Sequence, residues 1–202
     1  MRENRNIILR MTFEPYAART HEKMQEVLMS PDASGPAIHY YMIRGGSKKR
    51  NVTVLETGTV GSEYIKTYGH YHIGDIDETY WFSSGQGIVL QQKLADSTQA
   101  DVVEEFKAIR VTAGDSVYMP PGYGHLMVNV GSTWLVMTDN SPVDGADDSA
   151  SMPGHADYEM VKEMHGFAYY VVEKDGTPAL VANPLYKEVR STDLGGIPVV
   201  AK

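Results

Sequence analysis

The 202-residue sequence contains no cysteine, which excludes a disulfide framework, a thiolate zinc site and a thiol nucleophile. Any metal ion must therefore be held by histidine and carboxylate side chains. Long apolar runs are missing too: no window approaches the roughly 20 apolar residues that span a bilayer, and the N-terminal apolar stretch is too short for a secretion signal. We expect a cytoplasmic protein with no membrane partner.

Positive charge is scarce, because 18 Lys and Arg stand against 26 Asp and Glu, a net charge of −8. The short basic run Lys48–Arg50 would neutralise few phosphates of a duplex, so we expect no nucleic-acid partner. A small anion in a locally basic pocket stays compatible with this balance. What is present, 42% apolar residues with 19 Gly and 10 Pro, is typical of one globular domain.

Short runs rich in β-formers dominate the middle of the chain, separated by glycine and polar turns. Their spacing of roughly ten residues predicts an antiparallel sandwich or barrel. The predicted strands are 38–43, 52–55, 79–82, 87–94, 102–111, 116–119, 125–130 and 134–138.

The two ends of the chain are predicted to extend this core rather than to form further domains. In the N-terminal part, Thr20 is placed to cap a helical turn. In the C-terminal part we expect a short helix near 157–164, a hairpin that turns at Asp175-Gly176, and solvated acids at Asp144–Asp148. The expected single domain has three parts: an N-terminal helical arm (1–37), a barrel core (38–140), and a loop, short helix and closing strands (141–202).

Two stretches carry residues suited to metal binding. His70 and His72 are two apart, so in an extended chain both imidazoles share one face. Glu78 follows a turn at Gly74 and starts the next strand, where a hairpin would bring its carboxylate to the same point. His125 follows a Pro-Gly turn and is placed to point back into a barrel mouth. Three imidazoles and one carboxylate suit Fe(II), Mn(II), Ni(II) or Zn(II) better than Ca²⁺ or Mg²⁺.

These stretches resemble the two cupin motifs. The second motif is matched in full at Gly114, Pro120, Gly122, His125 and Asn129. The first is matched at His70, His72, Glu78 and Gly85, with Tyr64 in place of the leading glycine and five residues between His72 and Glu78. The resemblance implies an all-β cupin fold, a double-stranded β-helix or jelly-roll barrel.

The long spacing between His72 and Glu78 fits a narrower family, the cupin-type glucose-6-phosphate isomerases of archaea and some bacteria. Further landmarks of that family are Thr53-Val54-Leu55, Glu63 to Thr67, Glu78-x-Tyr80, Pro120-Pro121, Gly154-His155, His165-Gly166-Phe167 and Val181 to Tyr186. The resemblance covers about residues 38–187. It implies the metal ligands His70, His72, Glu78 and His125, which hold one divalent ion per chain, Fe(II) favoured over Mn(II), Ni(II) or Zn(II).

The resemblance also implies a sugar-phosphate pocket. Its substrate-binding residues are Thr53, Thr67, Gly69 and Tyr80, with Tyr40 or Tyr41 reaching in from the first strand. Its catalytic residues are Glu78, Tyr80 and His155. We expect positive charge for the phosphate from Lys66 or from Lys48–Arg50.

The implied activity is the interconversion of glucose 6-phosphate and fructose 6-phosphate, in glycolysis and gluconeogenesis, by a homodimer. The reaction moves a proton from C2 to C1 through a metal-stabilised cis-enediolate, or it moves a hydride between these carbons with help from the metal. Glu78 is the candidate base for the first route, but metal ligation would make it a weak base.

Other functions fit parts of the same pattern. A cupin Fe(II) dioxygenase would use the same ligands, although the His72–Glu78 spacing and the sugar-phosphate landmarks disfavour it. A non-catalytic cupin that binds sugar or metal would need no acid or base in the pocket, and a sugar-nucleotide epimerase of this fold would need no metal. The remaining histidines singled out, His21, His39 and His165, have no partner at ligand spacing.

Overall fold

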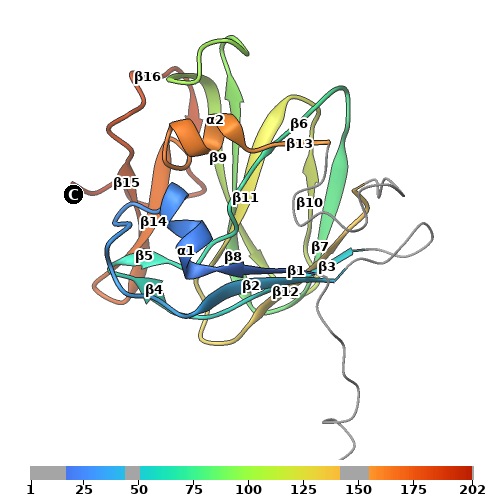
Figure 1. Ribbon diagram of the computed structural model, residues 1–202, viewed down its shortest axis with the longest axis vertical. Helices are drawn as coiled ribbons and strands as arrows, with labels where there is room; N and C mark the ends of the chain where they lie inside the picture. Colours follow the sequence, from blue (N-terminus) through green and yellow to red (C-terminus); the bar gives the residue numbers. More distant parts are fainter. Residues whose placement is uncertain (1–16, 44–50, 142–154, 202) are drawn as a thin grey trace, which may run out of the picture.

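The computed structural model describes residues 17–43, 51–141 and 155–201 (Figure 1). Strands dominate these residues, and the all-β fold class predicted from the cupin motifs is confirmed, with short helices towards both ends. Four parts of the predictions lie outside the described residues: the start of the arm (1–16), the basic run Lys48–Arg50, the acids Asp144–Asp148 and the landmark residue Gly154.

The elements in chain order are β1 (Ala17–Thr20), α1 (His21–Met24), the 3-10 turn η2 (Gln25–Val27), β2 (Ile38–Ile43), β3 (Asn51–Leu55), β4 (Thr59–Val60), β5 (Glu63–Tyr64), β6 (Tyr71–His72), β7 (Glu78–Ser84), β8 (Gln86–Leu94), β9 (Val102–Thr112), β10 (Ser116–Met119), β11 (Tyr123–Asn129), β12 (Leu135–Asp139), β13 (Ala156–Asp157), α2 (Glu159–Glu163), β14 (Tyr169–Lys174), β15 (Thr177–Ala182), β16 (Glu188–Val189) and β17 (Thr192–Asp193). Each strand predicted between residues 38 and 138 is present, within two residues of its expected bounds. The strands that the sequence pattern did not predict, such as β6 and β13, are mostly two residues long and too short to show a period.

Most of the strands belong to two large sheets. One sheet has six strands in the order β1-β2-β3-β12-β7-β10, and the other joins β11, β8, β9 and β16, with β17 also paired to β9. The smaller sheets are β15-β14-β5-β4 and β13-β6. The strands of the described residues form these separate sheets and not one closed barrel (Figure 1). Named pairs are antiparallel except that β16 and β17 run parallel to β9, which differs from the all-antiparallel expectation.

The larger of two apolar clusters in the described residues joins the two large sheets. It includes Phe82 of β7 and Leu135 of β12 from the first sheet, and Leu90 of β8 and Phe106 of β9 from the second. Burial alternates along β7, where Glu78, Tyr80 and Phe82 are buried and the residues between them are only partly buried. Because side chains alternate along a strand with a period of two, Glu78 and Tyr80 both point to the inner side of the sheet.

The turns carry clear local causes. Gly85, the last residue of the first motif, has a φ of +86°, and a Cβ there would lie 2.6 Å from the backbone oxygen of Trp134. Only glycine fits such a position without displacement of β12's leading segment. The predicted hairpin turn between β14 and β15 is confirmed, with Asp175 and Gly176 at φ values of +51° and +76°.

The N-terminal segment is helical only in part. The Thr20 hydroxyl accepts a hydrogen bond from the Lys23 backbone N–H at 3.2 Å, so the predicted cap of α1 is confirmed. The preceding residues form β1, which pairs with β2 and extends the six-stranded sheet. At the other end, α2 lies against η2. None of the helices in the described residues is long and apolar enough to cross a membrane.

Candidate metal centre and adjoining cavity

Backbone pairing brings the two motifs together. His70 forms an isolated bridge with His125, in which His125 N–H donates to the His70 carbonyl at 3.0 Å. His72 lies in β6, which pairs with β13 through Ala156. Glu78 is the first residue of β7, which pairs with β10 and β12. The hairpin expected between the His72 and Glu78 segments is therefore wrong, because β6 takes a different partner and a loop brings Glu78 to the histidines.

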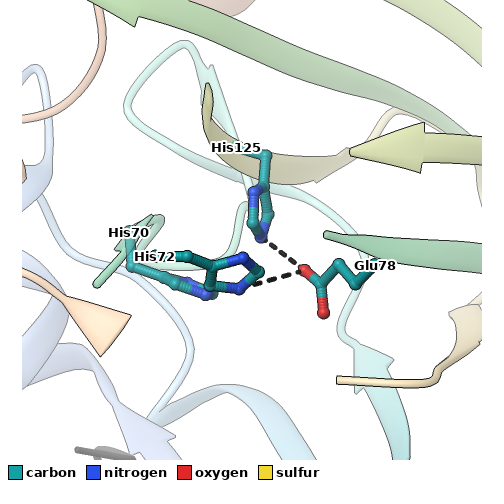
Figure 2. Close-up of side chains that lie close together, drawn as sticks. All are labelled: His70, His72, Glu78 and His125. Carbon is teal, nitrogen blue, oxygen red and sulfur yellow. Dashed lines mark ion pairs between the residues drawn. The ribbon is translucent and has the colours of Figure 1, made fainter. Parts of the chain in front are cut away.

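The four side chains converge on one point (Figure 2). Glu78 Oε1 lies 2.6 Å from His125 Nε2 and 3.7 Å from His72 Nε2. The ring centroid of His70 lies 5.0 Å from the ring centroid of His72 and 4.5 Å from that of His125. One potential ligand atom from each of the four residues lies within 4.8 Å of the others. Among the described residues, this is the group of His and acidic side chains close enough together to hold a metal ion.

The facing atoms of this group have no protein hydrogen bonds of normal geometry. They are His72 Nε2, His125 Nε2 and Glu78 Oε1, and all of them are buried. The other ring nitrogen of His72, Nδ1, lies 3.2 Å from the Ile76 carbonyl, which sets the tautomer that leaves Nε2 with a lone pair. Buried polar atoms without partners are costly, and a bound cation would satisfy all of them at once.

Burial and mutual proximity set the protonation states of the group. Burial, with His125 as the next cause, holds the pKa of His70 well below its ordinary value. Burial also lowers the pKa of His72. For Glu78 burial alone would raise the pKa, but His125 and the other two histidines outweigh burial and lower it to about 2. Neutral imidazoles and an ionised carboxylate are the forms that ligate a metal.

These residues fit a divalent transition metal. Three imidazoles and one carboxylate are a nitrogen-rich donor set that suits Fe(II), Mn(II), Ni(II) or Zn(II). The group has one carboxylate and no Lys or Arg side chain. The structure thus places the four predicted ligands, His70, His72, Glu78 and His125, around one candidate metal centre, and the identity of the ion stays a prediction.

A cavity opens beside this centre, and the residues predicted to bind substrate line it. Thr53 of β3, Thr67, Gly69 and Tyr80 all contribute to its wall, as does His155. Of the two tyrosines expected from the first strand, Tyr40 lines the cavity and Tyr41 is not among its lining residues; His72 is not among them either.

Two of these residues, Thr67 and His155, have defined polar contacts, and the pKa of a third, Tyr80, is shifted. The Thr67 Oγ1 accepts a hydrogen bond from the Met127 N–H at 3.0 Å, which leaves its own proton to donate. The His155 Nε2 lies 3.1 Å from the Ser141 Oγ. Burial, with contributions from Glu78 and Asp139, raises the pKa of Tyr80 well above its ordinary value, so Tyr80 presents a neutral O–H.

The cavity wall also includes residues that the sequence patterns did not predict. Asn51 and Asp139 are cross-strand neighbours, with the Asn51 amide donating to the Asp139 carboxylate at 2.8 Å, and Ser141 and Tyr158 complete this side. Asn51 and Asp139 are 88 positions apart in the chain. Only the pairing of β3 with β12 brings them together, so no local spacing could have indicated them.

The prediction that Lys66 supplies positive charge to the pocket is wrong. Lys66 is buried, its Nζ lies 2.5 Å from Glu63 Oε1, and it donates to the Val27 carbonyl at 2.6 Å. Its charge is therefore used within the fold. Nor are all the remaining histidines isolated, because His21 Nδ1 lies 3.0 Å from His39 Nε2, although no third ligand joins them in the described residues.

Comparison with known proteins places the chain in a family. A sequence profile described as "Glucose-6-phosphate isomerase (GPI)" matches residues 33–184. The chain is 35% identical over 137 residues to the glucose-6-phosphate isomerase of Thermococcus kodakarensis, covering 67% of this chain and 63% of that protein. It is 34% identical over 137 residues to that of Pyrococcus furiosus, with the same shares of both chains covered. The match therefore spans less than two thirds of either relative.

Among solved structures, the chain resembles the Drosophila melanogaster CENP-C cupin domain at a TM-score of 0.38 and 12% identity, over 54% of this chain and 72% of that one. A likeness at that level supports no argument about function. The profile match is the stronger finding, because it spans most of the chain and contains every residue of the four-membered metal group. The chain belongs to the glucose-6-phosphate isomerase family.

Proposed function

We propose that this protein is a metal-dependent aldose-ketose isomerase that interconverts D-glucose 6-phosphate and D-fructose 6-phosphate. The observation that carries the proposal is that the candidate metal ligands and the predicted substrate-binding residues lie side by side. The histidines and Glu78 that fit a metal face a cavity whose wall includes Thr53, Thr67 and Tyr80. A sugar phosphate offers adjacent oxygens for the first set and an anionic end for the hydroxyls of the second.

The metal group is proposed to hold one divalent ion per chain, with Fe(II) favoured and Mn(II), Ni(II) or Zn(II) as alternatives. When bound, the ion would supply a Lewis acid for the negative charge that develops on the oxygens of C1 and C2. His70, His72 and His125 would contribute ring nitrogens, while Glu78 would contribute the anionic ligand. The buried position of Glu78 Oε1 keeps water from competing for it.

Glu78 is also the candidate base at C2. Its neighbours lower its pKa to about 2, so it holds a proton weakly. This weak basicity favours a hydride shift between C2 and C1 over proton abstraction. Isomerisation in D₂O separates the two routes: a hydride shift leaves the product free of carbon-bound deuterium, whereas abstraction by Glu78 introduces deuterium from solvent.

Tyr80 and His155 are proposed to orient the sugar hydroxyls beside the metal. Tyr80 shares the buried face of β7 with Glu78, and its phenol stays protonated, so it can donate a hydrogen bond to a substrate oxygen. His155 approaches from the segment before β13, with its Nε2 beside Ser141. An imidazole at this position can pass a proton between O1 and O2.

The test is fructose 6-phosphate turnover, coupled to a glucose-6-phosphate dehydrogenase, with protein stripped by chelator and then given each of the four metals. Activity that disappears on stripping and returns with a metal supports the proposal. Absence of turnover with every metal, after metal uptake is confirmed, overturns it. Oxygen consumption by the Fe(II) form would instead indicate a dioxygenase.

A matched pair of variants locates the activity. Glu78→Gln keeps the size of the side chain but removes its charge, and we expect loss of metal and of turnover together. Glu22→Gln makes the same change on an exposed glutamate of α1 and should change neither. Retained metal with full activity in Glu78→Gln would remove Glu78 from both roles.

The same proposal includes the setting of the enzyme. We propose a cytoplasmic homodimer in glycolysis and gluconeogenesis whose partner is the small sugar phosphate, without nucleic acid or membrane. The net charge of −8 supports the exclusion of nucleic acid. Light scattering after size-exclusion chromatography should give about twice the 22.3 kDa mass of the chain.

A further inference from the structure

The cavity lacks a cationic side chain in its described wall. Its lining residues include the acids Glu78 and Asp139 and the hydroxyls of threonine, serine and tyrosine, but no Lys or Arg. A phosphate group carries close to two negative charges near neutral pH, and burial of such charge needs compensation. Lys66 does not provide it, because it is paired with Glu63.

A buried arginine stands directly behind this wall. Arg19 of β1 is 4% exposed and is the register partner of Tyr40 in β2. Its Nε donates to the Tyr40 hydroxyl at 3.1 Å, and its guanidinium carbon lies 5.8 Å from the centroid of the Tyr40 ring. An arginine keeps its charge when buried, so Arg19 is a fixed cation one side chain away from the cavity.

The contacts of Tyr40 determine where its proton points. The hydroxyl oxygen accepts from Arg19 Nε and also from the backbone N–H of Tyr68 at 3.3 Å. Within residues 17–43, 51–141 and 155–201 the hydroxyl donates to no protein acceptor. Both acceptor positions of the oxygen are occupied, so the O–H must donate in another direction, and Tyr40 lines the cavity.

The backbone places this donor among the predicted substrate contacts. Tyr68, which donates to Tyr40, stands between Thr67 and Gly69, and both of these residues line the cavity. A hydroxyl that accepts from a guanidinium is polarised and becomes a stronger donor. The Tyr40 O–H, the Thr67 hydroxyl and the nearby backbone can then meet one anionic group together.

We propose that Arg19 is a positioning residue for the phosphate of the substrate: its guanidinium holds and polarises the Tyr40 hydroxyl, which donates to a phosphate oxygen in the cavity. This inference rests on the proposed function for the identity of the substrate. Arg19 does not touch the substrate itself. It places a positive charge behind the part of the wall that the structure describes, and it fixes the direction of the Tyr40 proton.

The test compares Arg19→Met, Arg19→Lys and Tyr40→Phe in the metal-loaded protein. We expect Arg19→Met and Tyr40→Phe to raise KM for fructose 6-phosphate about 10- to 100-fold, the effect of one hydrogen bond to a charged group, with kcat changed less than about threefold. Arg19→Lys should recover part of the loss because it restores the cation. The double variant should be no worse than either single variant, since both act through one hydroxyl proton.

Specificity for phosphate is the readout that a merely structural role would not move. The inhibition constant of inorganic phosphate should rise with KM in Arg19→Met and Tyr40→Phe, while that of the neutral polyol sorbitol should stay unchanged. Arg190→Met, which removes an exposed arginine paired with Glu104, is the matched control and should leave every constant unchanged. An unchanged KM in both Arg19→Met and Tyr40→Phe, or an equal loss for phosphate and sorbitol, would overturn the inference.

Calorimetric titration with glucose 6-phosphate separates this inference from the proposed function. Binding that weakens in Arg19→Met and Tyr40→Phe, in a protein that isomerises nothing, would support the role of Arg19 and reject the isomerase. Turnover by the wild-type protein with unweakened binding in both variants would reject the role of Arg19 and leave the isomerase intact. If the wild-type protein binds neither glucose 6-phosphate nor phosphate, both proposals fail.

Discussion

Two buried polar clusters of this protein differ in the charged side chains that they contain. Lys66 and Glu63 form an ion pair 2.5 Å long, and backbone groups complete it: Lys66 donates to Val27 O, and Glu63 accepts from Met29 N–H. The metal group has one carboxylate and three imidazoles, without a Lys or Arg. The first cluster contains its own cation and ties the segment after α1 to the core. The second offers the donor set that suits a divalent transition metal.

The largest effect should follow from removal of a ligand. His125→Ala deletes the ring that faces Glu78, so we expect loss of bound metal and a fall in turnover of about 1000-fold or more, the several kcal/mol that a Lewis acid contributes. Metal analysis beside the coupled assay measures both. His165→Asn removes an exposed histidine and serves as the control. Full metal content and activity in His125→Ala would contradict the assignment of this cluster as the metal centre.

The opposite result is expected for the other cluster. Lys66→Met leaves Glu63 buried and uncompensated, which should lower the free energy of unfolding by about 3–5 kcal/mol in urea titrations. The double variant Lys66→Met/Glu63→Met removes both charges and should recover much of that loss. Folded Lys66→Met should keep its kcat and its metal. Loss of turnover without loss of stability would show that Lys66 serves the metal centre or the cavity and not the fold.

Low pH should reduce the stability of the fold through a third kind of buried polar group, the histidine His39. His39 lies outside both clusters, beside His21 and under the influence of Lys66, and burial lowers its pKa to about 4. Because the folded pKa is lower than the ordinary value of about 6.5, the contribution of His39 is complete above pH 6.5 and is lost as the pH falls towards 4. The loss is of order 3 kcal/mol at most.

Urea unfolding at several pH values between 7.5 and 4 measures this loss. His39→Gln should flatten the curve over that window, whereas His165→Asn should not. Lowered pKa values of His70 and His72 act with the same sign, so saturation with metal should reduce their share and leave that of His39. An unaltered pH profile in His39→Gln would show that His39 is not the group responsible.

The smallest effect is expected at the start of α1. Thr20→Ala removes the side-chain acceptor of the Lys23 N–H and should cost about 1 kcal/mol in urea unfolding. α1 leads into the segment that Lys66 contacts at the Val27 carbonyl. The change should therefore weaken the packing around the Lys66–Glu63 pair and leave the metal group unaffected. Thr20→Ser keeps the acceptor and should stay close to wild type. Metal content and KM should be the same in both.

Local patterns predicted much of the fold. Long runs such as β8 and β9 follow from their β-formers and flanking turns, and the cap at Thr20 and the turn at Asp175 follow from residue type. The patterns missed β1 ahead of the helix and the parallel pairing of β16 with β9. Such pairings depend on where distant strands lie, because a short segment takes its conformation from a neighbouring sheet edge.

The candidate site divides in the same way. His70, His72, Glu78 and His125 could be proposed as ligands from spacing and resemblance, since residue chemistry and a period of two are local properties. The burial of Lys66 could not be read locally, because Val27 and Tyr170 approach it only after folding. The same holds for Arg19, whose importance depends on its register with Tyr40 across two strands.

The sequence by itself determined which chemistry is available: histidine and carboxylate ligands without thiols, hydroxyl groups at strand positions and turns that require glycine. Only the tertiary structure decided which charged side chains form ion pairs within the fold and which polar side chains line the cavity. The physical reason is that the electrostatic environment of a side chain depends on everything within a few ångströms of it. Most of those neighbours here, such as Arg19 and Tyr40 or Asn51 and Asp139, come from distant parts of the chain.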